Sequence, residues 1–152
     1  MNQQLYANHK CCIDWSRVDS YLAGHNVFPR TVELDLTNRC SRACPMCPVP
    51  RSGAPVRELT AGFVGRFLGV LEGHTRGIIL SGGEPTLSRH FVEILRTTRR
   101  RGFDQVAIIT NGSELGRPEI QDALLEHATS IRLSLYDWYD ADTPARSFFE
   151  QL

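Results

Sequence analysis

The segment TVELDLTNRCSRACPMC, residues 31–47, joins an expected β-strand to a loop with three cysteines. Residues 31–36 alternate in polarity and are rich in strand-forming side chains, so they predict a first strand. Cys40, Cys44 and Cys47 follow with the spacing Cys-x3-Cys-x2-Cys. Thiolates are the usual ligands of iron–sulfur clusters, and short spacings let one loop wrap around a cluster. Three ligands would leave one iron of a four-iron cluster open, which is typical of a site where chemistry takes place.

The cysteine spacing leaves three alternatives to such a cluster open. A structural zinc site would need four ligands, and His25 and His74 lie well outside the loop. An electron-transfer ferredoxin would normally supply a fourth cysteine for each cluster. The third alternative is that the three cysteines are core residues without a ligand. Cys11 and Cys12 match no ligand spacing, and we expect them to be incidental thiols.

The composition is that of an ordinary globular domain of 152 residues, long enough for one hydrophobic core. Lys and Arg number 17, as do Asp and Glu, so no net field favours nucleic acid or an anionic membrane as a partner. The N-terminal residues lack the apolar core of a signal peptide, and no run approaches the roughly 20 apolar residues of a membrane span. We therefore expect a cytoplasmic protein without nucleic-acid or membrane partners, whose cysteines are thiols or metal ligands.

Helix and strand patterns alternate along the rest of the chain. Residues 1–29 are expected to form a leader with a short helix around Val18, Tyr21 and Leu22, and residues 30–152 one domain. Further strands are expected at residues 78–80, 106–109 and 131–135. Four further helices are expected. The first is capped by Thr60 and has Phe63, Val64, Phe67, Leu68 and Leu71 on its apolar face, and the second is capped by Ser88 or Thr86 and has Phe91, Val92, Leu95 and Thr98 on its face. The third begins at Pro118 and carries Ile120, Leu124 and Leu125, and the fourth lies near Pro144. The basic run of Arg96 with Arg99–Arg101 suits the C-terminal end of the second of these helices, with an anionic partner or substrate as the alternative.

Apolar strands that alternate with helices predict an α/β fold with a parallel sheet and right-handed crossovers. The periodicity leaves open a doubly wound sheet or part of a β/α barrel. Polar motifs follow the strands: Ser81–Pro85 after the second, Thr110–Gly112 after the third and Ser134 at the end of the fourth. The active sites of β/α barrels are built at the C-terminal ends of their strands. The sequence therefore favours a partial (β/α) barrel of about four β/α units.

Two of these motifs carry a family resemblance. The cysteine loop after the first strand and Ser81-Gly82-Gly83-Glu84-Pro85 after the second together resemble the radical S-adenosylmethionine (radical SAM) superfamily. Thr110-Asn111-Gly112 and Ser134 are weaker matches, and ordinary turn chemistry is the alternative for them. The resemblance covers residues 31–136 and implies the N-terminal part of the family's core domain. That core has six β/α units, so the chain is either a fragment or truncated product, or a partner completes the barrel.

The resemblance implies a four-iron, four-sulfur (4Fe-4S) cluster on the three cysteines and S-adenosylmethionine as the second cofactor. It assigns cofactor-binding roles to seven residues. Met46 would lie against the adenine, where the family more often has an aromatic, and Ser134 would lie at the ribose. Gly82 and Gly83 would let the backbone approach a ligand closely, Glu84 would accept from the amino group, Pro85 would fix the turn, and Asn111 would lie at the methionyl end or the substrate. No catalytic side chain is assigned.

The function implied is that of an enzyme. Reductive cleavage of S-adenosylmethionine would give a 5′-deoxyadenosyl radical that abstracts hydrogen from an unknown small-molecule or peptide substrate, with modification of a peptide or a cofactor precursor favoured. A reductant such as flavodoxin or ferredoxin would supply the electron. The alternatives are a truncated, non-catalytic cluster-binding fragment and an electron-transfer protein.

Overall fold

The computed structural model describes residues 15–44, 47 and 55–134, and its central feature is a parallel sheet of four strands. The strands are β1 (Thr31–Thr37), β2 (Gly77–Gly82), β3 (Gln105–Thr110) and β4 (Ser130–Leu133), in the order β1-β2-β3-β4. The helices are α1 (Trp15–Leu22), α2 (Ala61–Leu71), α3 (Phe91–Arg100) and α4 (Pro118–His127), with a short 3-10 helix η1 (Pro85–Leu87) after β2. Met46, Cys11, Cys12 and Pro144 lie outside the described residues.

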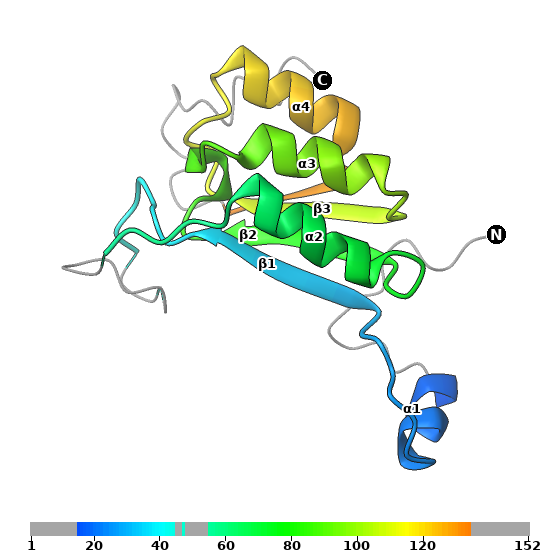
Figure 1. The fold of residues 1–152 in the computed structure, drawn as a ribbon. Helices are drawn as coiled ribbons and strands as arrows, with labels where there is room; N and C mark the ends of the chain where they lie inside the picture. Colours follow the sequence, from blue (N-terminus) through cyan, green and yellow to red (C-terminus); the bar gives the residue numbers. More distant parts are fainter. Residues whose placement is uncertain (1–14, 45–46, 48–54, 135–152) are drawn as a thin grey trace.

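The arrangement of helices decides between the two α/β architectures. Helices α2, α3 and α4 all lie on one face of the sheet (Figure 1), and the spatial order of the strands follows the sequence. A doubly wound sheet would reverse its strand order and carry helices on both faces. Helices confined to the outer face are the arrangement of a β/α barrel. The predicted partial (β/α) barrel is therefore confirmed.

The hydrophobic core lies between the sheet and these three helices. Leu34 of β1 lies beside Leu80 of β2, which lies beside Ile108 of β3, so one row of apolar side chains crosses the sheet. Side chains alternate between the faces of a strand, and this row belongs to the face that the helices cover. The core comprises Leu34, Leu36, Ile78, Leu80, Val106 and Ile108 from the strands and Val64, Leu68, Phe91, Ile94, Leu95, Ile120 and Leu124 among the helical residues.

The other face of the sheet is polar at its edges. Glu33 and Asp35 of β1, which alternate with the buried leucines, are exposed, as is Arg132 of β4. In a β/α barrel this face lines the interior. Charged side chains therefore border the inner surface of the partial barrel.

The expected helices that fall within the described residues are all present, with corrections in detail, and the helix expected near Pro144 lies outside those residues. Thr60 caps α2 by accepting a hydrogen bond from the backbone N–H of Phe63, as predicted. Phe63 itself is 48% exposed and Leu125 is 59% exposed, so their assignment to the buried faces is wrong. Each lies one position, or about 100°, from the stripe that packs on the sheet.

The prediction that Ser88 or Thr86 caps α3 is also wrong. The residue before α3 is His90, which makes no capping hydrogen bond through its side chain. The hydroxyl of Ser88 instead accepts from the backbone N–H of His90, and Thr86 lies within η1. A 3-10 turn therefore lies between β2 and α3, and the hydroxyls of Thr86 and Ser88 form hydrogen bonds at this turn and not at the start of α3.

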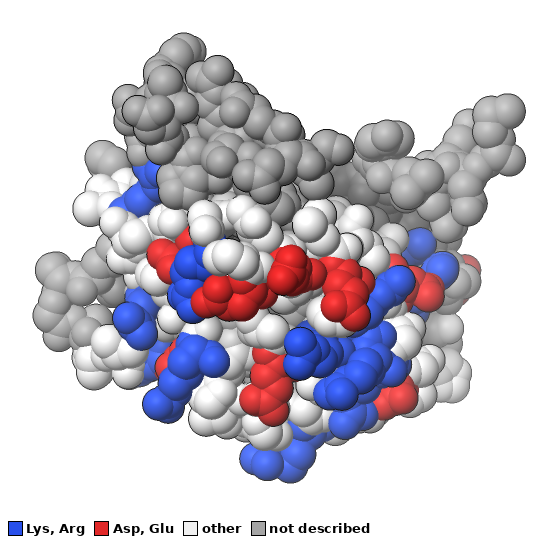
Figure 2. All heavy atoms as spheres, turned by 90° about the horizontal axis from the view of Figure 1, so that it is seen from above, with Lys and Arg blue, Asp and Glu red and all other residues white. Residues whose placement is uncertain are grey.

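The outer surface of the helical layer carries charges of both signs (Figure 2). Arg101, at the end of α3, forms an ion pair with Glu72 at 2.7 Å, and Arg99 donates to the carbonyl of Phe103. These contacts agree with the interpretation of the basic run as a helix end. In the part of the chain that the structure describes, none of the helices has the length and apolar character needed to cross a membrane.

Candidate functional site

The motifs of the sequence lie together at one edge of the sheet. Parallel strands end on the same side, so the residues after β1, β2 and β3 become neighbours although they are far apart in the chain. The cysteine loop follows β1, Gly83 and Glu84 follow β2, and Asn111 follows β3. Ser134 follows β4, where its backbone N–H donates to the carbonyl of Thr110. This edge is where β/α barrels place their active sites.

Gly82 and Gly83 allow the end of β2 to touch the chain that enters the cysteine loop. Gly82 has φ +125°, and a Cβ there would lie 2.5 Å from the carbonyl oxygen of Thr37. A Cβ on Gly83 would overlap the carbonyl of Arg39. The N–H groups of Gly83 and Glu84 donate to these same two carbonyls, both at 2.7 Å. The close approach in this structure is therefore to the protein's own backbone, and both positions require glycine.

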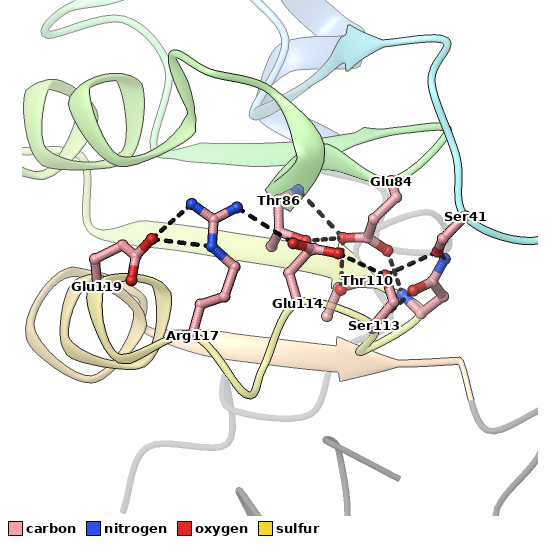
Figure 3. Close-up of polar contacts among 9 residues, drawn as sticks. Ser41, Glu84, Thr86, Thr110, Ser113, Glu114, Arg117 and Glu119 are labelled. Carbon is pink, nitrogen blue, oxygen red and sulfur yellow. Dashed lines mark hydrogen bonds and ion pairs between the residues drawn. The ribbon is translucent and has the colours of Figure 1, made fainter.

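Glu84 lies at the centre of the site and is fully buried. One carboxylate oxygen accepts from the backbone N–H of Thr86 (3.1 Å), the hydroxyl of Thr86 (2.5 Å) and the hydroxyl of Thr110 (2.7 Å). The other oxygen accepts from the backbone N–H of Asn111 at 2.6 Å. Figure 3 shows the carboxylate of Glu84 beside Thr86 and Thr110. A buried carboxylate is tolerated only when such donors replace water. Glu84 thus ties the end of β2 to the end of β3.

Asn111 connects this buried carboxylate to the cysteine loop. The residue is 9% exposed, and its amide nitrogen lies 3.5 Å from the sulfur of Cys40 and 3.2 Å from the hydroxyl of Ser41. The hydroxyls of Ser41 and Ser113 are 2.8 Å apart. Hydrogen bonds from the β3 loop therefore hold the first turn of the cysteine loop in place.

The three cysteines meet the chemical requirements of cluster ligands. Cys40, Cys44 and Cys47 are of intermediate exposure on one short loop, so a ligand can approach them from the solvent side. Among the described residues, no three His, Cys, Asp or Glu side chains are gathered tightly enough to hold a single metal ion. In an iron–sulfur cluster each thiolate binds a different iron, so the three sulfurs need not meet at one point. The donor set fits a cluster, and Asn111 adds a donor beside one of its sulfurs.

A cavity of about 420 Å³ adjoins the site at the open edge of β1. Its lining consists of Asp35–Asn38, Arg57–Leu59, Gly82 and Gly83. Residues 57–59 return from the cysteine loop and run beside β1: the N–H of Leu59 donates to the carbonyl of Leu36 at 2.8 Å, and Glu58 forms an antiparallel bridge with Thr37. Both ends of the segment that carries the cysteines are thereby anchored to β1.

The carboxylate of Glu58 fixes this return to the turn before α3. It accepts from the backbone N–H of Arg89 at 2.9 Å and lies 3.5 Å from the guanidinium of the same residue. The pKa of Glu58 is lower than its ordinary value of 4.5. The largest cause is a hydrogen bond from the Ser88 hydroxyl, and the backbone N–H of Arg89 and the charges of Arg89 and His90 act in the same direction. The carboxylate form is therefore favoured by the fold.

Sequence reasoning missed the partners that hold the site together. Thr86, Thr110 and Ser113 carry hydroxyls next to predicted site residues, and that adjacency was the available signal. Beyond Ser113, Arg117 forms ion pairs with Glu114 at 3.2 Å and with Glu119 at 2.6 Å, and Figure 3 shows its guanidinium between the two carboxylates. These contacts extend the loop's connections to the start of α4.

Known proteins match the sequence over much of its length. The Radical SAM superfamily model matches residues 34–145. "PqqA peptide cyclase" of Xanthomonas oryzae pv. oryzae (strain MAFF 311018) is 37% identical over 119 residues, which cover 72% of this chain and 30% of that protein. The protein of the same name from Xanthomonas campestris pv. campestris (strain B100) is also 37% identical over 119 residues, 72% of this chain and 29% of its own. "Probable GTP 3',8-cyclase" of Methanopyrus kandleri is 36% identical over 84 residues, 55% of this chain and 27% of that protein.

The chain thus spans about 30% of the length of the peptide cyclases that it matches. The family match runs through the cysteine loop, Gly82–Glu84 and Asn111, and it covers more than half of the chain. The chain belongs to the radical SAM superfamily.

Proposed function

We propose that this chain forms part of a radical SAM enzyme whose 4Fe-4S cluster is bound by Cys40, Cys44 and Cys47. The observation that carries the proposal is that the three-cysteine loop, Gly82, Gly83 and Asn111 follow neighbouring strands at the C-terminal edge of a partial barrel, with the amide of Asn111 beside the Cys40 sulfur. When bound, the reduced cluster supplies one electron to S-adenosylmethionine, which is cleaved to methionine and a 5′-deoxyadenosyl radical that takes a hydrogen atom from the substrate.

The residues of the chain contribute binding and orientation. Gly82 and Gly83 bring the end of β2 against the chain that enters the cysteine loop, and both line the adjoining cavity of about 420 Å³. Glu84 is proposed as an acceptor for the amino group of S-adenosylmethionine, and its carboxylate also holds the two loops after β2 and β3. Ser134, at the end of β4, is proposed to contact the ribose, and Met46, outside the described residues, the adenine. Pro85 begins η1 and fixes the direction of the chain after Glu84.

The substrate is proposed to be polar, with a peptide or a cofactor precursor favoured. Asp35 and Arg132 are exposed on the inner face of the sheet in the C-terminal halves of β1 and β4, and the active sites of β/α barrels lie at the C-terminal ends of their strands. The names of the relatives point in the same direction, since one is a peptide cyclase and the other a nucleotide cyclase. We also propose that residues 30–152 are part of one core domain, which further β/α units or a partner completes. A reductant such as flavodoxin or ferredoxin is proposed to supply the electron.

The test begins with the chain reconstituted with iron and sulfide in the absence of oxygen. We expect cluster absorbance, and after reduction with S-adenosylmethionine present we expect 5′-deoxyadenosine. Cys44→Ala should lose both, because it removes a ligand. Cys12→Ala is the matched control, since it removes a cysteine outside the three-cysteine loop and should retain both.

The outcomes separate the candidate functions. A chain without cluster absorbance, or a Cys44→Ala variant with unchanged iron content, contradicts the proposal. A bound cluster without 5′-deoxyadenosine would instead indicate a cluster-binding part that needs the rest of the core. Cluster spectra that do not respond to S-adenosylmethionine would favour an electron-transfer protein.

A further inference from the structure

The side-chain amide of Asn111 points at the sulfur of a proposed cluster ligand. Its nitrogen lies 3.5 Å from the sulfur of Cys40 and comes from the end of β3, a different strand from the one that carries the cysteines. The backbone N–H of Arg42 also lies 3.5 Å from this sulfur, but it comes from within the cysteine loop. A sulfur atom is a weak acceptor as a thiol and a stronger one as a thiolate.

The orientation of the amide follows from its partners. The side-chain oxygen of Asn111 accepts a hydrogen bond from the backbone N–H of Ser113 at 2.9 Å. A backbone N–H can only donate, so it fixes which end of the amide is the oxygen. The amino end is then the one that faces Cys40 and Ser41. Asn111 therefore presents a donor, not an acceptor, to the sulfur.

The position of the amide is fixed before any cluster binds. The backbone N–H of Asn111 donates to Glu84 at 2.6 Å, and Thr110, the preceding residue, donates its hydroxyl to the same carboxylate. Glu84 is fully buried and Asn111 is 9% exposed. A donor held by buried neighbours keeps its geometry without a cost for ordering at the moment of binding.

We propose that Asn111, positioned by Glu84, donates a hydrogen bond to the Cys40 sulfur and thereby raises the reduction potential of the cluster. Reduction adds negative charge to an iron–sulfur cluster, and a donor to a ligand sulfur stabilises that charge. The inference rests on the proposed function, because it requires the cluster on Cys40. It assigns Asn111 a positioning and tuning role toward the cluster, in addition to any contact with the second cofactor.

The test is a redox titration of the reconstituted chain without S-adenosylmethionine. Asn111→Leu keeps the approximate size of the side chain and removes the donor, so its midpoint potential should be lower than that of the parent. Thr98→Val is the matched control: it also removes a buried polar group, but the hydrogen bond that is lost lies within α3, so its midpoint should be unchanged. Equal midpoints for Asn111→Leu and the parent, at equal cluster content, would overturn the inference.

A second measurement does not depend on the folding of a variant. The parent chain is labelled with ¹⁵N-asparagine, and its reduced cluster is studied by pulsed electron paramagnetic resonance. A coupling to an asparagine nitrogen supports the hydrogen bond, and its absence overturns it. Failure of the parent chain to bind any cluster would contradict the proposed function itself, which keeps the two failures distinct.

Discussion

The backbone nitrogen of Asn111 lies 2.6 Å from a carboxylate oxygen of Glu84, although 27 positions separate the two residues in the sequence. The contact joins the ends of β2 and β3 beyond the last residues that the strands pair. Because the same carboxylate also accepts from Thr86 and Thr110, one buried side chain sets the geometry of two loops. The stability of the site should therefore depend strongly on this carboxylate.

Glu84→Gln should destabilise the fold and lower the cluster content. The amide has nearly the same shape, but it replaces one acceptor oxygen with an amino group that faces donors from Thr86, Thr110 or Asn111. A buried hydrogen bond to a charged group is worth about 1.5–3 kcal/mol, so we expect a loss of at least about 2 kcal/mol in the free energy of unfolding. Urea denaturation of the parent and the variant measures this difference.

The control for that experiment is Glu93→Gln on α3. Glu93 is exposed in the first turn of the helix, where loss of its charge should cost at most about 1 kcal/mol. Equal losses for the two substitutions would show that the buried carboxylate has no special role.

Thr110→Val and Thr98→Val form a second matched pair, since both threonines are buried. The hydroxyl of Thr110 donates to Glu84 at 2.7 Å and accepts from the backbone N–H of Gly112 at 3.0 Å. The hydroxyl of Thr98 donates only to the carbonyl of Ile94 within α3. We expect Thr110→Val to cost about 2 kcal/mol and Thr98→Val about 1 kcal/mol or less, measured by thermal and urea unfolding. The reverse order would contradict a network centred on Glu84.

Gly83→Ala should be far more damaging than its size suggests. The added Cβ would overlap the carbonyl of Arg39, which is backbone and accepts a hydrogen bond from Glu84. The loops would have to separate, so we expect a loss of at least about 2 kcal/mol and poor cluster retention. The measurements are the free energy of unfolding and the iron content after reconstitution.

Gly65→Ala on α2 provides the comparison. Nothing lies within 4 Å of a Cβ built there, and alanine favours a helix over glycine by roughly 0.5–1 kcal/mol. The variant should therefore be more stable than the parent. A stabilised Gly83→Ala variant would mean that the two loops do not pack closely at this point.

Local patterns were sufficient to predict the elements of this fold. The alternation at residues 31–36 and the Thr60 cap were confirmed because both depend on neighbours in the sequence. The faces of the helices were less predictable: Leu125 adjoins a core residue in the sequence, yet only contact with α3 and the sheet decides which of the two is buried. Periodicity alone left the single-sided layer of helices open, and only the placement of the polar motifs after the strands favoured it.

The interior of the site could be predicted only in part. The cysteine spacing and the Gly-Gly-Glu-Pro segment pointed to the correct edge of the sheet. The partners of Glu84 could not be foreseen, because Thr110 and Asn111 reach it from another strand and their hydroxyl and amide groups are also ordinary turn chemistry. The close approach of Gly83 to Arg39 has the same origin, since it depends on how β2 ends beside β1.

Glu58 leads to the last prediction, because it anchors the return of the cysteine segment and its pKa is lowered in the folded protein. A carboxyl whose pKa is lower when folded stabilises the fold above its unfolded pKa, near 4.5, and loses this contribution as the pH falls through the folded value. Glu58→Gln keeps an acceptor for the N–H of Arg89 but has no such dependence. We therefore expect the parent to be more stable than the variant at about pH 6 and the difference to shrink at about pH 3. Urea unfolding of both proteins across this range measures it, and a difference that stays constant would show that the charge of Glu58 does not contribute.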